Sequence, residues 1–194
     1  MATRATPLPP DARRASIIAA TLPLLRRYGA SVTTAQIALA AGVAEGTLFR
    51  AFADKDALIG AAIKSAFDPE PVEAKLAAID RALPLRDQLT AIVEILQDRV
   101  EQVWQLMTIL NIPLPPPTKP DVHSDAGIRA QISAIFELHK QELRVDATYA
   151  QRILHSLAFA GTHPRITDGK PFTAREIVAI LLDGISRRPD PELT

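Results

Sequence analysis

Two short segments on either side of a glycine constrain the fold of this chain more than any other feature. Residues 33–52 read TTAQIALAAGVAEGTLFRAF, with glycines at positions 42 and 46. Isolated helices shorter than about 12 to 15 residues are marginal in water, because nucleation is costly. Two helices this short persist only if they are stabilised by packing at a defined angle to each other. The stretch therefore predicts a helix-turn-helix unit.

Signals for helix ends agree with this interpretation. Residues 33–36, TTAQ, fit a capping box, with Thr33 at the N-cap and a glutamine three residues later. Gly42 can adopt the left-handed conformation that ends a helix. A second short helix is predicted from about Glu45 to Ala51, and Asp54 suits the N-cap of the helix that follows.

Apolar residues at helical spacing recur along the rest of the chain. They predict helices near residues 17–28, 54–66, 71–83, 85–110, 128–143, 150–161 and 173–185. Pro23 is expected to bend or break the first of these near Ala19. Thr173 and Glu176 fit a second capping box. The proline-rich stretch 113–122 cannot be helical.

No strand pattern and no internal repeat is evident. The predicted fold class is all-α with about nine helices. We expect a flexible basic arm over residues 1–11, a three-helix helix-turn-helix domain over 12–66, and a helical body over 67–194.

Composition narrows the class of protein. Hydrophobic residues make up 47 % and charged residues 23 % of 194 residues, which is typical of a globular protein. The absence of cysteine excludes disulfides, thiolate metal sites and cysteine nucleophiles. Neither a signal peptide nor an uninterrupted apolar run of about 18 residues is evident. We therefore expect a soluble, cytoplasmic protein with no membrane span.

The neutral net charge conceals an asymmetry. Residues 1–66 contain 8 Lys and Arg against 4 acids, a balance of +4. The totals are 22 of each, so the remainder contains 14 basic and 18 acidic residues, a balance of −4. A basic N-terminal part with an acidic body is a weak indication of nucleic-acid contact.

The second short segment carries the candidate contact residues. Burying Leu48 and Phe52 leaves Thr47 and Arg50 on its outer face, together with Glu45 and Gly46. A helix of this length fits the DNA major groove, where its N-terminal residues reach base edges. A plain reading is also open, in which Arg50 is a solvated charge and both glycines serve the turn.

Several residues together resemble the DNA-binding domain of the TetR family. They are Thr33, Ile37, Ala38, Ala41, Gly42, Val43, Gly46, Thr47, Leu48, Phe49, Phe52, Lys55 and Leu58, within a match over roughly residues 12–62. The resemblance implies a homodimeric, ligand-responsive transcriptional regulator, usually a repressor, that binds a pseudo-palindromic operator in double-stranded DNA.

The resemblance also implies roles for individual residues. The DNA-binding candidates are Thr33, Thr34, Glu45, Gly46, Thr47, Phe49, Arg50 and Lys55. Thr33 and the start of its helix would meet phosphate, since helix N-termini favour anions. Three departures are evident: Ala44 replaces the usual serine, Phe49 the usual tyrosine, and Ala51 a frequent histidine. Because these departures remove usual phosphate-binding groups, we expect more of the phosphate contact to come from Arg50, Lys55 and an N-terminal arm with Arg4, Arg13 and Arg14.

The resemblance further implies that the body, residues 67–194, is a ligand-binding and dimerisation domain, and this domain contains two further sets of candidates. Residues that pack a core by default but could line a ligand pocket are Trp104, Met107, Phe136, His139 and Phe159. Residues at the positions of the family's dimer-forming helices are Ile153, Leu154, Leu157, Ile177, Ile180 and Leu181. The effector is expected to be small and apolar or amphipathic.

Other classes of function find little support or remain open. The four histidines lack metal-ligand spacing, and neither a phosphate loop nor a nucleophile elbow occurs, so we expect no metal, no cofactor and no catalysis. Two alternatives stay open: a ligand-independent DNA-binding protein, and a helical ligand-binding or adaptor protein that has lost its operator.

Overall fold

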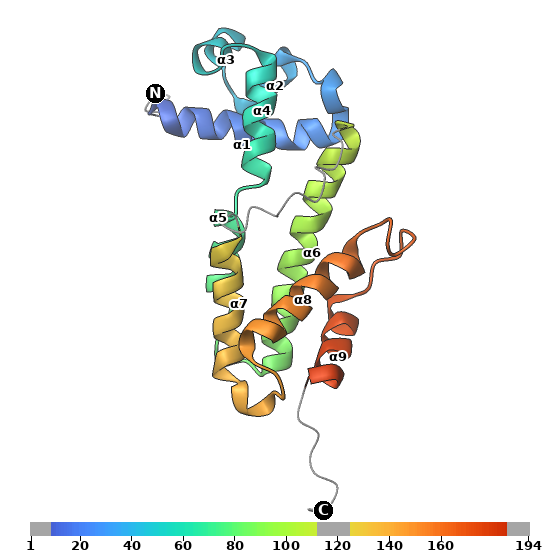
Figure 1. Ribbon diagram of the computed structural model, residues 1–194. Helices are drawn as coiled ribbons and strands as arrows, with labels where there is room; N and C mark the ends of the chain where they lie inside the picture. Colours follow the sequence, from blue (N-terminus) through green and yellow to red (C-terminus); the bar gives the residue numbers. More distant parts are fainter. Residues whose placement is uncertain (1–8, 112–124, 186–194) are drawn as a thin grey trace, which may run out of the picture. The chain divides into compact units, whose positions relative to one another are not determined.

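The computed structural model describes residues 9–111 and 125–185 of the chain. Within these ranges every regular element is helical, which confirms the predicted fold class (Figure 1). In chain order the elements are α1 (Pro10–Tyr28), η1 (Gly29–Ser31), α2 (Thr34–Ala41), α3 (Glu45–Ala51), α4 (Lys55–Ala66), α5 (Glu70–Ala77), α6 (Leu85–Ile109), α7 (Ala126–Leu138), η2 (Lys140–Glu142), α8 (Ala147–Thr162) and α9 (Ala174–Ile185). The proline-rich stretch 113–122 lies outside the described residues.

The chain forms two compact units. The described part of the first unit comprises residues 9–68 and 105–111, and that of the second comprises 69–104 and 125–185. Helix α6 thus contributes its last turn to the first unit. Within the first unit Ile109 lies against Gly29, which has a positive φ of 56°, and a Cβ at position 29 would lie only 2.9 Å from Cγ2 of Ile109.

Helix α1 runs through Pro23 without a break, so of the two outcomes expected there the break is wrong. Pro10 at its first turn is tolerated because the N–H it lacks would be unpaired in any case. Pro23 removes the hydrogen bond to the carbonyl of Ala19, which lies on an exposed part of the helix. Water can solvate that carbonyl, and Ile17, Thr21 and Leu25 hold the opposite side in the core of the first unit.

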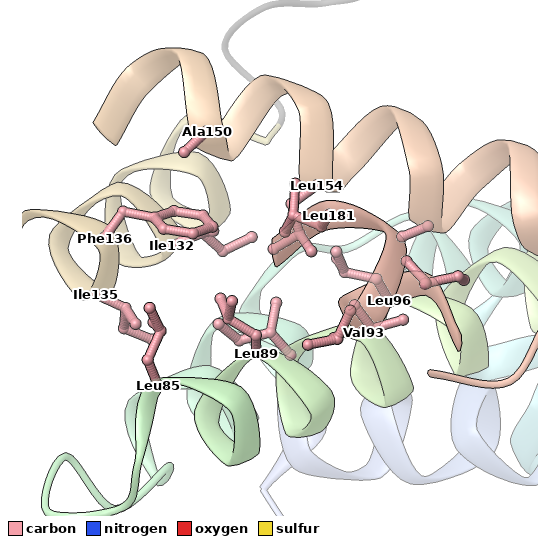
Figure 2. Packing of buried hydrophobic residues seen from close by; sticks show 14 of the residues in the cluster. Leu85, Leu89, Val93, Leu96, Ile132, Ile135, Phe136, Ala150, Leu154 and Leu181 are labelled. Carbon is pink, nitrogen blue, oxygen red and sulfur yellow. The ribbon is translucent and has the colours of Figure 1, made fainter. Parts of the chain in front are cut away.

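The core of the second unit is built from the facing sides of α6, α7, α8 and α9. Figure 2 shows Leu89 and Val93 of α6 directed towards Ile132 of α7, Leu154 of α8 and Leu181 of α9. These side chains are at most 1 % exposed. Their spacing of three or four residues along each helix is the pattern that predicted the elements.

Two helices end earlier than predicted. Helix α5 ends at Ala77 and not near residue 83, because Asp80 accepts a hydrogen bond from the N–H of Ala82 and Leu83 precedes a proline. Helix α7 ends at Leu138 and not near Leu143, and a 3-10 turn follows it. Apolar spacing alone did not distinguish a helix from the turn that follows.

The second predicted capping box is present at α9. The N–H of Thr173 donates to Oε2 of Glu176 at 2.8 Å, and the N–H of Glu176 donates to Oγ1 of Thr173 at 3.2 Å. The bonds that the N–H and the hydroxyl of Thr173 donate to Oε2 of Glu176 favour the carboxylate and lower the pKa of Glu176 below its ordinary value.

Candidate nucleic-acid interface

The first short helix, α2, is fixed at both ends by the residues that predicted it. The hydroxyl of Thr33 accepts from the N–H of Gln36 at 3.2 Å, and the Gln36 side chain accepts from the N–H of Thr33 at 2.8 Å. Gly42 has φ 65° and ψ 31°, the left-handed conformation, and its N–H bonds back to Ala38 and Leu39. Both the capping box and the glycine stop are confirmed.

Helix α3 buries Leu48 and presents its other faces to solvent. Thr47 is half-buried, whereas Gly46, Phe49 and Arg50 are exposed. Arg50 makes no hydrogen bond or ion pair with any residue in the two described ranges. The outer face predicted from the sequence is therefore available to a ligand.

Gly46 is not a steric requirement of the fold. A Cβ placed on it would have no atom within 4 Å, and its φ lies outside the left-handed region. The plain reading, in which the turn itself requires both glycines, is thus wrong for position 46, although it holds for Gly42. A bare backbone in open space permits close approach by a molecule outside the chain.

Thr34 and Glu45 contact each other across the turn. The hydroxyl of Thr34, in the first turn of α2, donates to Oε1 of Glu45, the first residue of α3. Two of the predicted DNA-binding residues are brought together in this way. Sequence spacing did not indicate the bond, because the path of the turn decides which side chains meet.

Two predicted contact residues of the first unit, Lys55 and Arg14, have structural partners. Nζ of Lys55 donates to the carbonyl of Ala30 at 2.9 Å. The Arg14 guanidinium donates to the carbonyl of Ala51 and lies 4.1 Å from the centre of the Phe52 ring. Arg13 and Arg14 belong to α1, so they are not part of a free arm as expected. Arg4 lies outside the described residues.

The departure at Ala44 has a structural consequence. Ala44 is the N-cap of α3 and supplies no side-chain cap, whereas Asp54 caps α4 by accepting from the N–H of Ala57 at 2.7 Å. Phe49 is 51 % exposed, so its ring is presented to solvent and not used to fill the core.

The predicted pocket residues do not form one group. Trp104 and Phe159 are both near His163, with ring centres 4.2 Å and 5.4 Å from the histidine ring. Phe136 is fully buried in the core of the second unit, and Met107 belongs to the first unit. Sequence reasoning missed His163 because it follows the last turn of α8, where helical spacing gives no signal.

His139 lies beyond α7 and not on an apolar helix face. Its Nδ1 is 2.8 Å from Oε1 of Glu142, and its Nε2 is 3.3 Å from Nε2 of Gln88. It is a partly buried histidine with polar neighbours, as its position at the end of the helix allows.

A second polar group lies within the helical body. Arg99 of α6 and Asp125, the residue before α7, form an ion pair of 2.9 Å whose side chains are 18 % and 30 % exposed. Burial lowers the pKa of His155 of α8 below its ordinary value of 6.5, Asp125 opposes this, and Arg129 and Arg99 add to it. His155 is therefore neutral at physiological pH, and its buried Nδ1 has no hydrogen-bond partner within the described ranges.

The predicted dimer residues divide by exposure. Leu154, Ile177 and Leu181 are at most 2 % exposed and pack in the core of their own chain. Ile153 and Leu157 pack partly against that core. Ile180 is 53 % exposed, and the other exposed large apolar side chains of α8, α9 and the segment between them are Tyr149, Phe159, Ile166 and Phe172. Of these four the sequence had singled out only Phe159, as a pocket candidate.

Other kinds of site are not indicated in the described ranges. No group of three or more potential metal ligands gathers there. None of the helices described is long and apolar enough to cross a lipid bilayer. An open groove of about 450 Å³ is lined by Arg86, Asp87, Thr90, Ala91 and Glu94 of α6 and Arg175 of α9. Its mixed charges do not favour one class of ligand.

Comparison with known proteins agrees with the geometry of the first unit. Residues 17–62 match the model of a family described as bacterial regulatory proteins, tetR family. This segment contains α2, the Gly42 turn, α3 and the part of α4 up to Ala62. No curated protein matches the sequence.

Solved structures share the fold over nearly the whole chain. A TetR transcriptional regulator of Streptomyces coelicolor, SCO0520, is 21 % identical with TM-score 0.56, covering 91 % of this chain and 99 % of its own. NalD of Pseudomonas aeruginosa, a secondary repressor of a multidrug efflux pump, is 20 % identical with TM-score 0.53, covering 92 % and 100 %. The superantigen PfiT is 16 % identical with TM-score 0.60, covering 94 % and 100 %.

These structural likenesses concern the fold alone, since one fold can support proteins with very different roles. The family model, by contrast, matches a segment that contains α3 and the turn before it. The chain therefore contains, over residues 17–62, an N-terminal domain of the kind found in the tetR family of bacterial regulatory proteins.

Proposed function

We propose that this protein binds operator DNA through α3 and regulates transcription, as a repressor released by a small-molecule effector. The observation that carries the proposal is the exposed face of α3. Gly46 leaves the backbone bare where the fold does not need it, and Arg50 is a cation with no partner in the described ranges. A face of this kind suits the major groove, which admits one α-helix.

The first test is binding of the full-length protein to DNA from immediately upstream of its own gene, at several salt concentrations. A protein that neutralises phosphates loses affinity steeply as salt rises, because counterions are released on binding. We expect a footprint and a steep negative slope of log affinity against log salt. Weak binding to all sequences with a flat slope would instead favour the adaptor alternative.

Arg50→Ala tests the assignment of α3. If Arg50 contacts phosphate, the variant weakens binding to all sequences and reduces the salt slope by about 1. If it contacts a base, preference is relaxed at one position of each half-site. Arg86→Ala is the matched control, because it removes the same charge from an exposed position in the second unit. Equal effects of both variants would contradict the assignment.

We further propose that the protein is a homodimer formed through the outer sides of α8 and α9. A two-fold arrangement would present two recognition helices to successive major grooves, about 34 to 36 Å apart. Exposed apolar side chains on these helices, Phe159 and Ile180, support this face. Of the six residues predicted for the interface, Ile180 is the one whose exposure suits direct contact with a partner.

Substitution of Ile180 tests the dimer. Ile180→Asp places a charge in the proposed interface and should give a monomer in sedimentation measurements at micromolar concentration. Leu138→Asp, at a residue 67 % exposed on α7, is the control and should leave the dimer intact. A dimer that survives Ile180→Asp would place the interface elsewhere.

The effector half of the proposal concerns the second unit. Trp104 is the single tryptophan of the chain and lies beside His163 and near Arg165, whose guanidinium is 5.5 Å from its ring centre. A small apolar or amphipathic molecule that binds there should change its fluorescence. Effector and operator should then weaken each other by the same factor, as linkage requires. Ligands that bind without altering DNA affinity would favour the ligand-independent alternative.

A further inference from the structure

The bond between Thr34 and Glu45 places a fixed carboxylate at the start of α3. Glu45 is exposed, and one of its oxygens accepts the hydrogen bond from the Thr34 hydroxyl. No ion pair joins Glu45 to a cation of residues 9–111 or 125–185. Its second oxygen therefore has lone pairs to offer to a group outside the chain.

A carboxylate on a DNA-facing surface carries an electrostatic cost. Duplex DNA has one negative charge per about 1.7 Å of its axis, so Glu45 would be repelled by phosphate at any sequence. A base edge can compensate for this if it donates a hydrogen bond. In the major groove the amino group at N4 of cytosine is the donor that Glu and Asp side chains recognise.

We propose that Glu45, positioned by Thr34, accepts a hydrogen bond from N4 of a cytosine in each half-site of the operator. The inference rests on the proposed function, because it requires α3 to lie in the major groove. The N-terminal residues of a recognition helix are those that reach base edges, and Glu45 is the first residue of α3. Thr34 acts through Glu45 and is a positioning residue.

The preorganised carboxylate gives the contact its specificity. A free glutamate side chain would lose rotamer freedom on binding, whereas the bond to Thr34 restricts it beforehand. A thymine, which presents an acceptor and a methyl group in the major groove, would leave the second carboxylate oxygen without a donor. The structure thus assigns Glu45 both an attraction for cytosine and a penalty against thymine and guanine, which present no hydrogen-bond donor in the major groove.

The experiment is selection of binding sites from a random duplex library by the full-length protein and its variants. The wild type should select one invariant cytosine in each half-site. A second duplex in which thymine replaces this cytosine should bind about tenfold more weakly than the selected duplex, within the range typical of base contacts. Glu45→Ala should bind both duplexes within twofold of each other. Glu45→Gln should shift the preference towards adenine, whose N6 and N7 suit an amide.

Thr34 variants separate positioning from folding. Thr34→Val retains the branched shape but not the hydroxyl, and should reduce discrimination at the cytosine position. Thr34→Ser retains the donor and should restore it. Asp56→Ala removes another exposed acid of the first unit and controls for a general gain in affinity from lost negative charge.

The outcomes distinguish the inference from the proposed function. A Glu45→Ala protein that selects the same sequences as the wild type, with affinity raised equally for all, would overturn the role of Glu45 and leave the DNA-binding proposal intact. A wild-type protein that selects no sequence would overturn the proposed function and this inference with it.

Discussion

Ala44→Ser should stabilise the protein, because α3 begins without a side-chain cap. In the capped helices α2, α4 and α8 the N-cap carbonyl accepts from the N–H four residues on, and the side chain accepts from the N–H three residues on. At α3 the carbonyl of Ala44 accepts instead from the N–H of Thr47 at 2.8 Å. A serine hydroxyl at position 44 would accept the hydrogen bond from the N–H of Thr47, and the carbonyl of residue 44 could then accept from the N–H of Leu48.

The backbone is already suited to this change. Ala44 has φ −71° and ψ 146°, close to the φ −70° and ψ 160° of Asp146, which caps α8 by accepting from the N–H of Tyr149 at 2.8 Å. The N-cap dihedral angles need little change while the carbonyl exchanges Thr47 for Leu48, so the gain should approach the usual value of an N-cap, about 1 kcal/mol. Asp146→Ala should lose a similar amount.

Urea denaturation of the full chain, followed by circular dichroism, measures both changes. Hydrogen exchange at the amides of Thr47 and Leu48 shows whether the gain from Ala44→Ser arises at the start of α3. Ala44→Val is the control, since it adds bulk but no acceptor and should give no gain. If Ala44→Ser leaves stability unchanged while Asp146→Ala lowers it, the geometric comparison of the two N-caps is refuted.

Three further predictions concern the core, the pH dependence and the Arg14 contacts. Leu89→Ala, at a fully buried site, should cost about 2 to 5 kcal/mol of unfolding free energy in urea, whereas the same substitution at Leu39, which is 84 % exposed, should change it by at most about 0.5 kcal/mol. The pKa of His155 is lower in the folded chain than in the unfolded chain, so the unfolded state binds more protons as pH falls below 6.5, and the free energy of unfolding should fall. His155→Gln should lose less of this free energy between pH 7.5 and 5.5. An equal loss in both proteins would contradict the burial argument. Arg14→Lys should lower the thermal midpoint, because an ammonium cannot reproduce the stacking on Phe52 together with the bond to Ala51, and an unchanged midpoint would show that these contacts add nothing.

Local signals predicted the parts of the fold that depend on neighbours in sequence. The caps at Thr33, Asp54 and Thr173 are confirmed because each uses a side chain and an N–H three residues away. The stop at Gly42 depends on one residue's own φ. Helix ends that depend on a competing turn, as at Ala77 and Leu138, were predicted several residues too late.

The candidate site was predicted as a set of positions but not as a set of contacts. The sequence placed Arg50 on the outer face of a short helix, and the family model matches the segment that contains it. It also named Thr34, Glu45 and Lys55, without indicating that Thr34 would bond to Glu45 or Lys55 to a backbone carbonyl. Arg14 was expected on a free arm but contacts α3 and the Phe52 ring.

By itself, then, the sequence determined the helical class, the short helix-turn-helix segment and the face of α3 that remains free. Helical periodicity, capping and glycine conformation act over a few residues, so a linear reading can follow them. Only the tertiary structure decided which aromatic side chains gather around His163, which apolar residues of α8 and α9 remain exposed, and which oxygen of Glu45 is already used. These outcomes depend on contacts between residues distant along the chain, whose geometry is set by packing and not by local pattern.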